Sequence, residues 1–200
     1  MLCINCNSDK VMKYGVRVNK QGNNSQRYFC NSCSKEFSVR DSRGWDKDIK
    51  RAIITPDKHF PYEDKPAINT LVKAIKLVSP SIYVDLGDVG EWESVSQWKW
   101  KRKKRPPLEY MIPDIEKEIE AVNKGMDQID NALSSVNCDE RHFIEGNHDN
   151  WLNRFVEGYP YLAQYRLKTA IKLDERGYTY HPFGKFLKIG KLFFYHGHQY

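Results

Sequence analysis

The stretch HFIEGNHD, residues 142–149, decides the fold of this chain. Its apolar start predicts a short buried strand, and Gly146 breaks that strand before Asn147, His148 and Asp149 follow. An Asn oxygen and a His nitrogen are suitable ligands for a borderline divalent metal, and a following Asp can orient the imidazole. Taken alone, residues 146–149 are equally consistent with a polar turn after a strand.

Three other apolar runs end in the same kind of residues. Residues 51–55, 81–86 and 191–195 are rich in β-branched or aromatic side chains, which predicts buried strands. In α/β proteins, ligands gather outside the carboxyl ends of the strands, where the crossovers leave a crevice. We therefore expect the polar side chains after the four strands to converge on one site, and they are Asp57, His59, Asp88, Asn147 and His196.

The segments between the runs predict helices and an α/β fold class. Residues 66–78 carry apolar side chains near a 3.6-residue period, which predicts the first crossover helix. A second helix is expected to start after Pro113, with Asp114 as its N-cap. Strands that alternate with helices are typical of a layered α/β domain. The later stretch 178–195 instead predicts antiparallel strands with a turn at Gly190.

In this order, Asp-x-His, Gly-Asp, Gly-Asn-His-Asp and a late His resemble the motifs of calcineurin-like metallophosphoesterases, over residues 51–200. The resemblance implies a two-sheet αββα sandwich whose site holds two divalent ions. It assigns Asp88 as the carboxylate that bridges the ions. Asp57 and His59 would bind one ion, and Asn147 and His196 the other. Mn²⁺, Fe and Zn²⁺ all suit such a mixed ligand set, so the identity of the metal stays open.

The resemblance also implies the catalytic groups. His148 would lie beside the metals without binding them, and would stabilise charge on the transferring phosphoryl group or protonate the leaving oxygen. Asp149 would hold the other nitrogen of that ring. Glu91, three residues after Asp88, either positions substrate or is simply solvated.

The chain departs from the family pattern at the closing motif, Gly-His-x-His. Two interpretations fit residues 195–198, which read Tyr-His-Gly-His. In the first, His196 is the family's isolated histidine after a strand, and the closing motif lies beyond residue 200 in a longer protein. In the second, residues 195–198 are the closing motif, with Tyr in place of its Gly. We favour the first, because the strand-like run ends in His-Gly as the corresponding family strand does. His198 is then a neighbour of the site rather than an assured ligand.

Two Cys-x-x-Cys pairs mark a separate region at the N-terminus. Four thiolates around Zn²⁺ need two tight knuckles brought together by a hairpin. Residues 11–18 and 25–29 alternate in the way that hairpin strands do, and they lie between the two pairs. The spacing therefore predicts one structural zinc, with the ligands Cys3, Cys6, Cys30 and Cys33.

A pair of disulfides is the alternative for these four cysteines. We favour zinc, because the chain is expected to be cytoplasmic, without a signal peptide, and because the fifth cysteine, Cys138, has no partner. The knuckles resemble the zinc ribbons at the front of insertion-element transposases and other nucleic-acid-handling proteins. We expect a zinc ribbon at residues 1–40, a polar linker at 41–50 and the phosphoesterase-like domain at 51–200.

Positive charge is concentrated in two parts of the sequence. Residues 1–50 carry ten basic and five acidic side chains, and residues 99–105 add six basic ones. The rest of the chain carries 16 basic and 21 acidic side chains, and the overall net charge is +6. Clustered Lys and Arg neutralise phosphates, and Trp92, Trp98 and Trp100 offer planar faces for unpaired bases. We therefore expect DNA or RNA as a partner; the alternative is a solvated loop whose Trp residues pack locally.

Three functions fit these observations. The leading hypothesis is a two-metal phosphoesterase that cleaves phosphodiester bonds in nucleic acid, with the ribbon as a docking module. The second is a phosphatase or phosphodiesterase for small phosphoesters or phosphoproteins, whose ribbon contacts another protein. The third is a nucleic-acid-binding protein with a degenerate metal site, and the acidic residues Asp57 and Asp88 argue against it. No run approaches the ~20 apolar residues of a membrane span, and the oligomeric state stays open.

Overall fold

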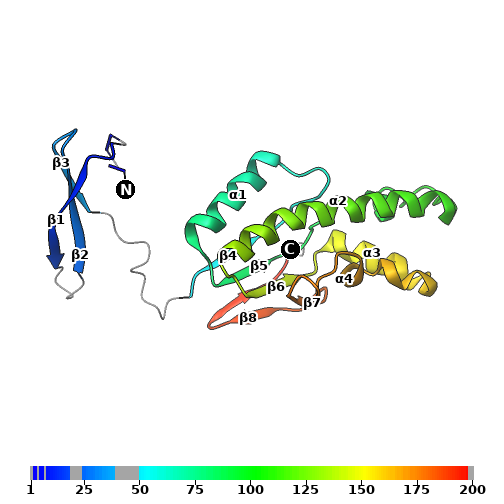
Figure 1. Cartoon of the computed structure of the whole chain (residues 1–200). Coiled ribbons are helices and arrows are strands. Elements are labelled where there is room, and N and C mark those ends of the chain that lie inside the picture. The colour runs from blue at the N-terminus through cyan, green and yellow to red at the C-terminus, as the bar shows by residue number, and fades with distance from the viewer. Residues whose placement is uncertain (1, 4, 7, 19–23, 39–49, 198–200) are drawn as a thin grey trace. The chain divides into compact units, whose positions relative to one another are not determined.

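The computed structural model describes residues 2–3, 5–6, 8–18, 24–38 and 50–197 (Figure 1). The chain divides into two units, Met1–Ile49 and Lys50–Tyr200. Each unit has its own cluster of buried side chains. His198, a predicted neighbour of the metal site, lies outside the described residues.

The N-terminal unit is a small antiparallel sheet. Strands β1 (Val11–Val18), β2 (Asn24–Cys30) and β3 (Lys35–Ser38) pair in that order, which confirms the predicted hairpin. The register shifts at Gly15, whose φ of 110° is open to glycine and strained for other residues. Its buried cluster is small and includes two of the four cysteines of the Cys-x-x-Cys motifs. So little apolar burial predicts that the unit needs an additional source of stability.

A four-stranded parallel sheet forms the centre of the C-terminal unit. Strands β4 (Ala52–Thr55), β5 (Ile82–Asp85), β6 (Glu140–Ile144) and β7 (Tyr178–His181) lie in that order, and all three pairings are parallel. The mixed α/β class is therefore confirmed. The prediction that residues 178–180 join an antiparallel set is wrong. The long helical connection after β6 gives β7 room to cross over and pair in parallel.

Two long helices cover one face of this sheet. Helix α1 (Lys65–Val78) matches its prediction, and the Asp64 side chain caps it by accepting from the N–H of Ala67. Helix α2 (Leu108–Ser135) begins earlier than predicted, and Pro113 lies inside it. Although Pro113 cannot donate its helical hydrogen bond, Met111 is buried and holds the first turns against the core. The proline was therefore a poor marker of the helix start.

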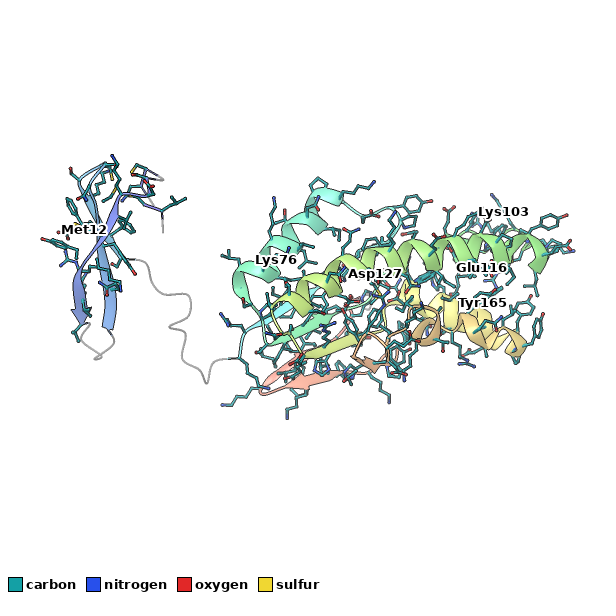
Figure 2. The ribbon with its side chains drawn as sticks, viewed as in Figure 1. Met12, Lys76, Lys103, Glu116, Asp127 and Tyr165 are labelled. Atoms are coloured by element: carbon teal, nitrogen blue, oxygen red, sulfur yellow. The ribbon has the colours of Figure 1, made fainter. Side chains whose placement is uncertain are left out.

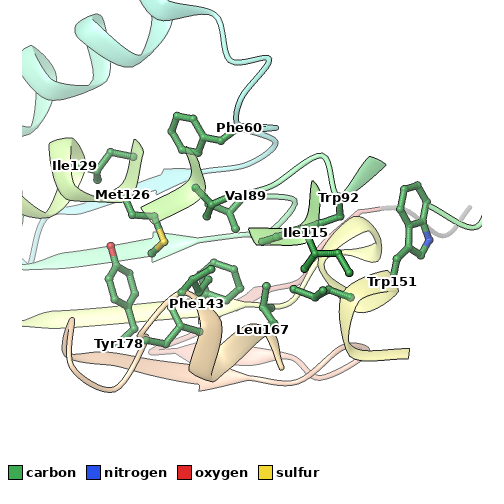
Figure 3. Close-up of a cluster of buried hydrophobic side chains, with 14 of the residues drawn as sticks. Phe60, Val89, Trp92, Ile115, Met126, Ile129, Phe143, Trp151, Leu167 and Tyr178 are labelled. Atoms are coloured by element: carbon green, nitrogen blue, oxygen red, sulfur yellow. The ribbon is translucent and has the colours of Figure 1, made fainter. Parts of the chain in front are cut away.

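Short helices complete the helical side of the unit. They are η1 (Glu93–Val95), α3 (Asn147–Glu157), η2 (Pro160–Tyr165) and α4 (Leu167–Ala170). Figure 3 shows the core beneath them, where Ile115 and Met126 from α2 meet Phe143 of β6, Leu167 of α4 and Tyr178 of β7. This core is continuous from α1 to the last parallel strand. It holds the loops after β4, β5 and β6 in fixed positions.

The opposite face of the sheet carries a hairpin. Strands β8 (Leu187–Ile189) and β9 (Leu192–Phe194) pair antiparallel around Gly190, as predicted, and Gly190 has a φ of 59°. Leu187 packs against Ile82 and Ile144 of the parallel sheet. In the described part of the chain this second layer is two strands wide, so a full two-sheet sandwich stays a prediction. Among the described residues, no helix combines the length and apolar character that a membrane crossing requires.

Candidate metal centre

The loops after β4 and β5 lie side by side through backbone hydrogen bonds. The N–H of Asp57 donates to the carbonyl of Gly87 at 3.1 Å, and the N–H groups of Lys58 and His59 both lie 3.0 Å from the carbonyl of Asp88. These bonds bring the predicted ligands of the first two motifs together, because they continue the pairing of β4 and β5 beyond the strand ends. The ligand positions are thus set by main-chain contacts.

Three of the predicted ligands have strained backbone conformations. Asp57, His59 and Asp88 have φ values of 51°, 49° and 50°, in the left-handed region. Such conformations cost on the order of 1–3 kcal/mol each and persist where the surrounding structure enforces them, most often at functional sites. Three of the eight described non-glycine residues with a positive φ are thus predicted ligands.

Two glycines allow the loops after β5 and β6 to touch. A Cβ atom on Gly146 would lie 2.1 Å from Oδ1 of Asp88, and one on Gly87 would lie 2.3 Å from the nitrogen of Gly146. Both distances are shorter than any real contact, and Gly87 also has a φ of 91°. The glycines of the Gly-Asp and Gly-Asn-His-Asp motifs are therefore required by the close approach of backbone to carboxylate.

Asp88 lies at the centre of the site. Its Oδ1 accepts from the backbone N–H of His148 at 2.8 Å, and its Oδ2 lies 3.3 Å from Nε2 of His196. Burial works to raise the pKa of Asp88, but the hydrogen bond and positive charge of His196, with those of His148, outweigh it. The pKa of Asp88 therefore lies below its usual value, and the side chain is a carboxylate.

His196 approaches this carboxylate from the segment after β9. Its Nδ1 lies 2.7 Å from the carbonyl of Leu86, so Nδ1 carries a hydrogen, because a carbonyl only accepts. Nε2 lies 2.9 Å from Oδ1 of Asn147 as well as 3.3 Å from Oδ2 of Asp88. Burial works to lower the pKa of His196, but Asp88 and the Leu86 carbonyl raise it above its usual value.

The contacts of Asp88, Asn147 and His196 provide a test of metal fit. If His196 is neutral, its Nε2 carries a lone pair. That lone pair faces the lone pairs of Oδ1 of Asn147 at 2.9 Å and of Oδ2 of Asp88 at 3.3 Å, and the three atoms repel one another. A proton or a cation among them removes that repulsion. A metal-binding His characteristically gives its other ring N–H to a backbone carbonyl, as Nδ1 of His196 does. The donor set therefore fits a divalent cation.

A second donor set shares Asp88. The ligand atoms of Asp57, His59 and Asp88 all lie within 4.8 Å of one another, so one ion can contact all three. The structure thus brings together the five side chains predicted to converge. They fall into two sets that have Asp88 in common, which is the arrangement that two neighbouring cations need.

Glu91 joins two of the site histidines, which its sequence position left undecided. Its Oε2 lies 2.8 Å from Nδ1 of His59, and its backbone carbonyl lies 3.0 Å from Nδ1 of His148. Ligand atoms of His59, Glu91 and His148 also lie within 4.8 Å of one another. Glu91 is therefore part of the site, although no spacing rule in the sequence distinguished it from a solvated carboxylate.

His148 sits in the first turn of α3 with its ring held on two sides. The ring lies against Trp151, with centroids 3.9 Å apart and planes tilted by 31°, and makes a T-shaped contact with the ring of His59 at 4.8 Å. Because its Nδ1 faces the carbonyl of Glu91, Nδ1 is assigned the hydrogen, and Nε2 is the ring nitrogen left for another partner. The catalytic role expected of His148 stays a prediction.

Asp149 does not hold His148, contrary to the expectation. Its Oδ2 accepts from the N–H of Asp88 at 2.7 Å and of Gly146 at 3.1 Å, while Oδ1 accepts from Nε1 of Trp92 at 2.9 Å. Adjacent residues on a helix do not face each other, so His148 and Asp149 project in different directions. Burial, followed by the charge of Asp88, raises the pKa of Asp149 to about 7. Asp149 positions the loops of the site.

A buried ion pair between Lys58 and Asp85 holds the loops after β4 and β5 in place. Nζ of Lys58 lies 2.8 Å from Oδ1 of Asp85, and the same oxygen accepts from the N–H of Gly87 at 3.0 Å. Asp85 is thus a hydrogen-bonded structural carboxylate. Burial raises the pKa of Asp85, and Lys58 opposes that effect. Nothing in the sequence marked Lys58 as buried, because a lysine in a polar loop is normally exposed.

The four N-terminal cysteines form a second candidate centre. Sγ of Cys3 lies 3.7 Å from Sγ of Cys33, and Sγ of Cys6 lies 3.6 Å from Sγ of Cys30. All four cysteines are free, and their sulfurs lie within 4.8 Å of one another. A tetrahedron with Zn–S bonds of about 2.3 Å has S···S edges of about 3.8 Å. The cluster therefore fits one zinc ion.

Comparisons with protein-family models, with curated proteins and with solved structures each found no match to this chain. Neither the two-metal arrangement nor the cysteine cluster is therefore supported by a known relative. The case for function comes from the contacts around Asp88.

Proposed function

We propose that residues 50–197 belong to a two-metal phosphoesterase that hydrolyses phosphodiester bonds in nucleic acid, with the N-terminal zinc ribbon as a docking module. The observation that carries this proposal is the position of Asp88, which is shared by the two donor sets. The calcineurin-like order of motifs supports the same assignment. Mn²⁺, Fe and Zn²⁺ all suit the ligands.

The proposed metal assignment follows the donor sets. Asp57, His59 and Asp88 would hold one ion, and Asp88, Asn147 and His196 the other. When bound, two divalent ions supply the Lewis acidity and the activation of a nucleophile that phosphoester hydrolysis at neutral pH requires. In the metal-free protein the pKa of Asp88 already lies below its usual value, so the side chain is available as a carboxylate.

The protein's own groups orient the reaction. Nδ1 of His148 is fixed by Glu91, so a protonated ring donates from Nε2 to the leaving oxygen. His59 is held by the Glu91 carboxylate, which fixes the ring before substrate arrives. Asp149 holds the N–H of Asp88 and Gly146, so the two central loops keep their spacing during the reaction.

The experiment measures hydrolysis of bis-p-nitrophenyl phosphate with Mn²⁺, Fe²⁺ or Zn²⁺ added, together with bound metal by elemental analysis. Asp88→Asn should lose both hydrolysis and site metal, because it removes the shared charge. Asp139→Asn is the matched control. Asp139 is exposed and precedes the N-terminal end of β6, away from the site, so this variant should keep both hydrolysis and site metal. A wild-type protein that binds two site metals yet cleaves no phosphoester would instead indicate the non-catalytic binding protein.

A further inference from the structure

The segment 97–105 between η1 and α2, called the tryptophan loop below, is anchored by part of its own charged run. Nζ of Lys99 pairs with Glu93 at 2.9 Å, and Nε1 of Trp100 donates to the carbonyl of Ser94 at 2.9 Å. Arg105 donates to the carbonyl of Val95 at 3.4 Å. These three side chains are committed to η1. Of the two cations, Lys99 is paired with a carboxylate, whereas Arg105 contacts only a neutral carbonyl.

The rest of the tryptophan loop projects into solvent. Trp98 is 70% exposed, and Nζ of Lys101 lies 5.0 Å from the centre of its ring. Residues 101–104, which are Lys, Arg, Lys and Lys, are all exposed. In the region that the structure describes, none of these four cations forms an ion pair with a carboxylate. Trp98 and the four cations are thus exposed together, with Lys101 placed over the Trp98 ring.

Trp92 does not contribute a stacking face, contrary to the sequence expectation. It is fully buried, and its indole N–H is donated to Asp149 at 2.9 Å. The three tryptophans between residues 92 and 100 therefore have three different roles. Trp92 belongs to the metal centre, Trp100 anchors the loop, and Trp98 is left open.

A short chain of contacts joins the loop to the metal centre. The N–H of Tyr62 donates to the carbonyl of His59 at 2.7 Å, and its hydroxyl donates to Oε2 of Glu93 at 3.1 Å. Glu93 in turn holds Lys99. Tyr62 is 66% exposed, so a second open ring lies between the donor set of His59 and the tryptophan loop.

We propose that the tryptophan loop binds single-stranded nucleic acid, with an unpaired base stacked on Trp98 and phosphates on residues 101–104. An exposed indole offers its face to an unpaired base, whereas the bases of a duplex have their faces covered by their neighbours. The four cations neutralise the backbone that follows the stacked base. Tyr62 provides the next stacking position toward the metals. This inference rests on the proposed function, and it adds the strand state of the substrate.

The test measures binding separately from hydrolysis. Fluorescence anisotropy with labelled dT20, rU20 and a 20-base-pair duplex is carried out on the full chain with Asp88→Asn, with zinc retained and with a denaturing gel to verify intact oligonucleotide. In this background Trp98→Ala should weaken single-strand binding by roughly 5- to 150-fold, the range for loss of one stacked base, and duplex binding by less than about twofold. The dT20 and rU20 arms distinguish DNA from RNA.

Phe193→Ala is the matched control. Phe193 is 66% exposed and has its own lysine, Lys188, at 5.3 Å, but it lies on the β8–β9 hairpin. Its loss should leave binding unchanged, and Trp98→Phe should restore part of the affinity that Trp98→Ala loses. Equal loss for single strand and duplex, or no loss, would overturn the inference. If wild type binds single strands in this Trp98-dependent way but hydrolyses no phosphodiester, the proposed function fails and the inference about the loop stands.

The four cations have a charge-matched control as well. Replacing residues 101–104 with Ala should reduce the slope of log K against log salt by roughly 3 for single strands, at about 0.7 per lost phosphate contact. Replacing Lys73, Lys76, Lys185 and Lys191, which are also exposed, removes the same charge elsewhere. Figure 2 shows Lys76 and Lys103 at opposite ends of the α1–α2 layer. A similar slope change in both variants would make the effect one of net charge and overturn the phosphate contacts.

Discussion

The two candidate metal centres differ in the relation between metal and fold. Around the four cysteines, the buried cluster contains Cys3, Cys30 and Phe37, and little else is available to hold three short strands together. Around Asp88, the loops continue from a parallel sheet whose core is complete without any ligand side chain from the site. We infer that the N-terminal unit needs zinc in order to fold. The C-terminal unit folds without metal, and its fold positions the metal ligands.

Zinc removal should give the largest effect. Structural zinc contributes on the order of 10–16 kcal/mol to small zinc domains, so a strong chelator should unfold residues 1–38 and leave 50–197 folded. Amide NMR signals from the two units of the full chain report this directly. Cys30→Ser should reproduce the loss, while Cys138→Ser, a buried cysteine in the other unit, should keep the ribbon signals. Simultaneous unfolding of both units on chelation would remove the contrast between them.

At the centre around Asp88, replacing a metal ligand and replacing a proton donor should have different effects on metal content and hydrolysis. His148→Gln should keep both site metals while hydrolysis falls by about 10²–10⁴, the usual scale for one general acid. Asp88→Asn should lose metal together with activity, since its carboxylate lies in both donor sets. Metal content by elemental analysis, measured beside the rate, separates the two. If His148→Gln lost metal as fully as Asp88→Asn, His148 would be a ligand, as its place beside His59 and Glu91 allows.

A single methyl group should test whether the fold makes the site. Gly146→Ala would place a Cβ 2.1 Å from Asp88, which the loops can accept only by separating. We expect a destabilisation of about 1–3 kcal/mol together with weaker metal binding. Gly158→Ala is the control, because its Cβ would lie 3.4 Å from the nearest atom and its φ is −73°. Thermal unfolding of both variants, with and without metal, provides the comparison.

The smallest effect is a dependence on pH in the absence of site metal. The pKa of His196 is raised in the folded protein above its usual 6.5. Its imidazolium therefore stabilises the fold fully below about pH 6.5, and this contribution is lost as pH rises through the higher folded value. We expect the unfolding midpoint of residues 50–197 to fall with rising pH over that interval when the site is metal-free. Added metal should abolish the trend, and so should His196→Gln.

The sequence predicted that the ligands converge, but it did not predict which side chains hold the ligand loops in place. Parallel strands deliver their carboxyl ends to one edge, so the positions of Asp57, Asp88 and Asn147 followed from three strand-like runs. The burial of Lys58 did not follow, because it depends on Asp85 from a neighbouring strand. The direction of Asp149 depended on where α3 begins, which no residue pattern specified to within one position.

The fold was predictable to the same degree. Alternation of apolar residues identified the hairpins at β1–β2 and β8–β9, since both contacts are local in sequence. The parallel pairing of β7 with β6 depends on a crossover through α3, η2 and α4. The local sequence pattern does not indicate such a crossover. The strand at residues 178–181 was therefore predicted to be antiparallel, although it pairs in parallel. Pro113 misled for a related reason: core packing of Met111 outweighs the lost helical hydrogen bond.

The distance in sequence between the ligands has a consequence for synthesis. Asp57, His59 and Asp88 leave the ribosome early, whereas His196 follows Asp88 by 108 residues. At roughly 5–20 residues per second, that interval lasts about 5–22 s, during which the nascent chain carries the first donor set and lacks the second. We therefore expect metals to load in the order of translation, with the Asp57–His59 position filled first. During that interval the growing polypeptide can bind metal at the first donor set, and His196 joins the second set only later.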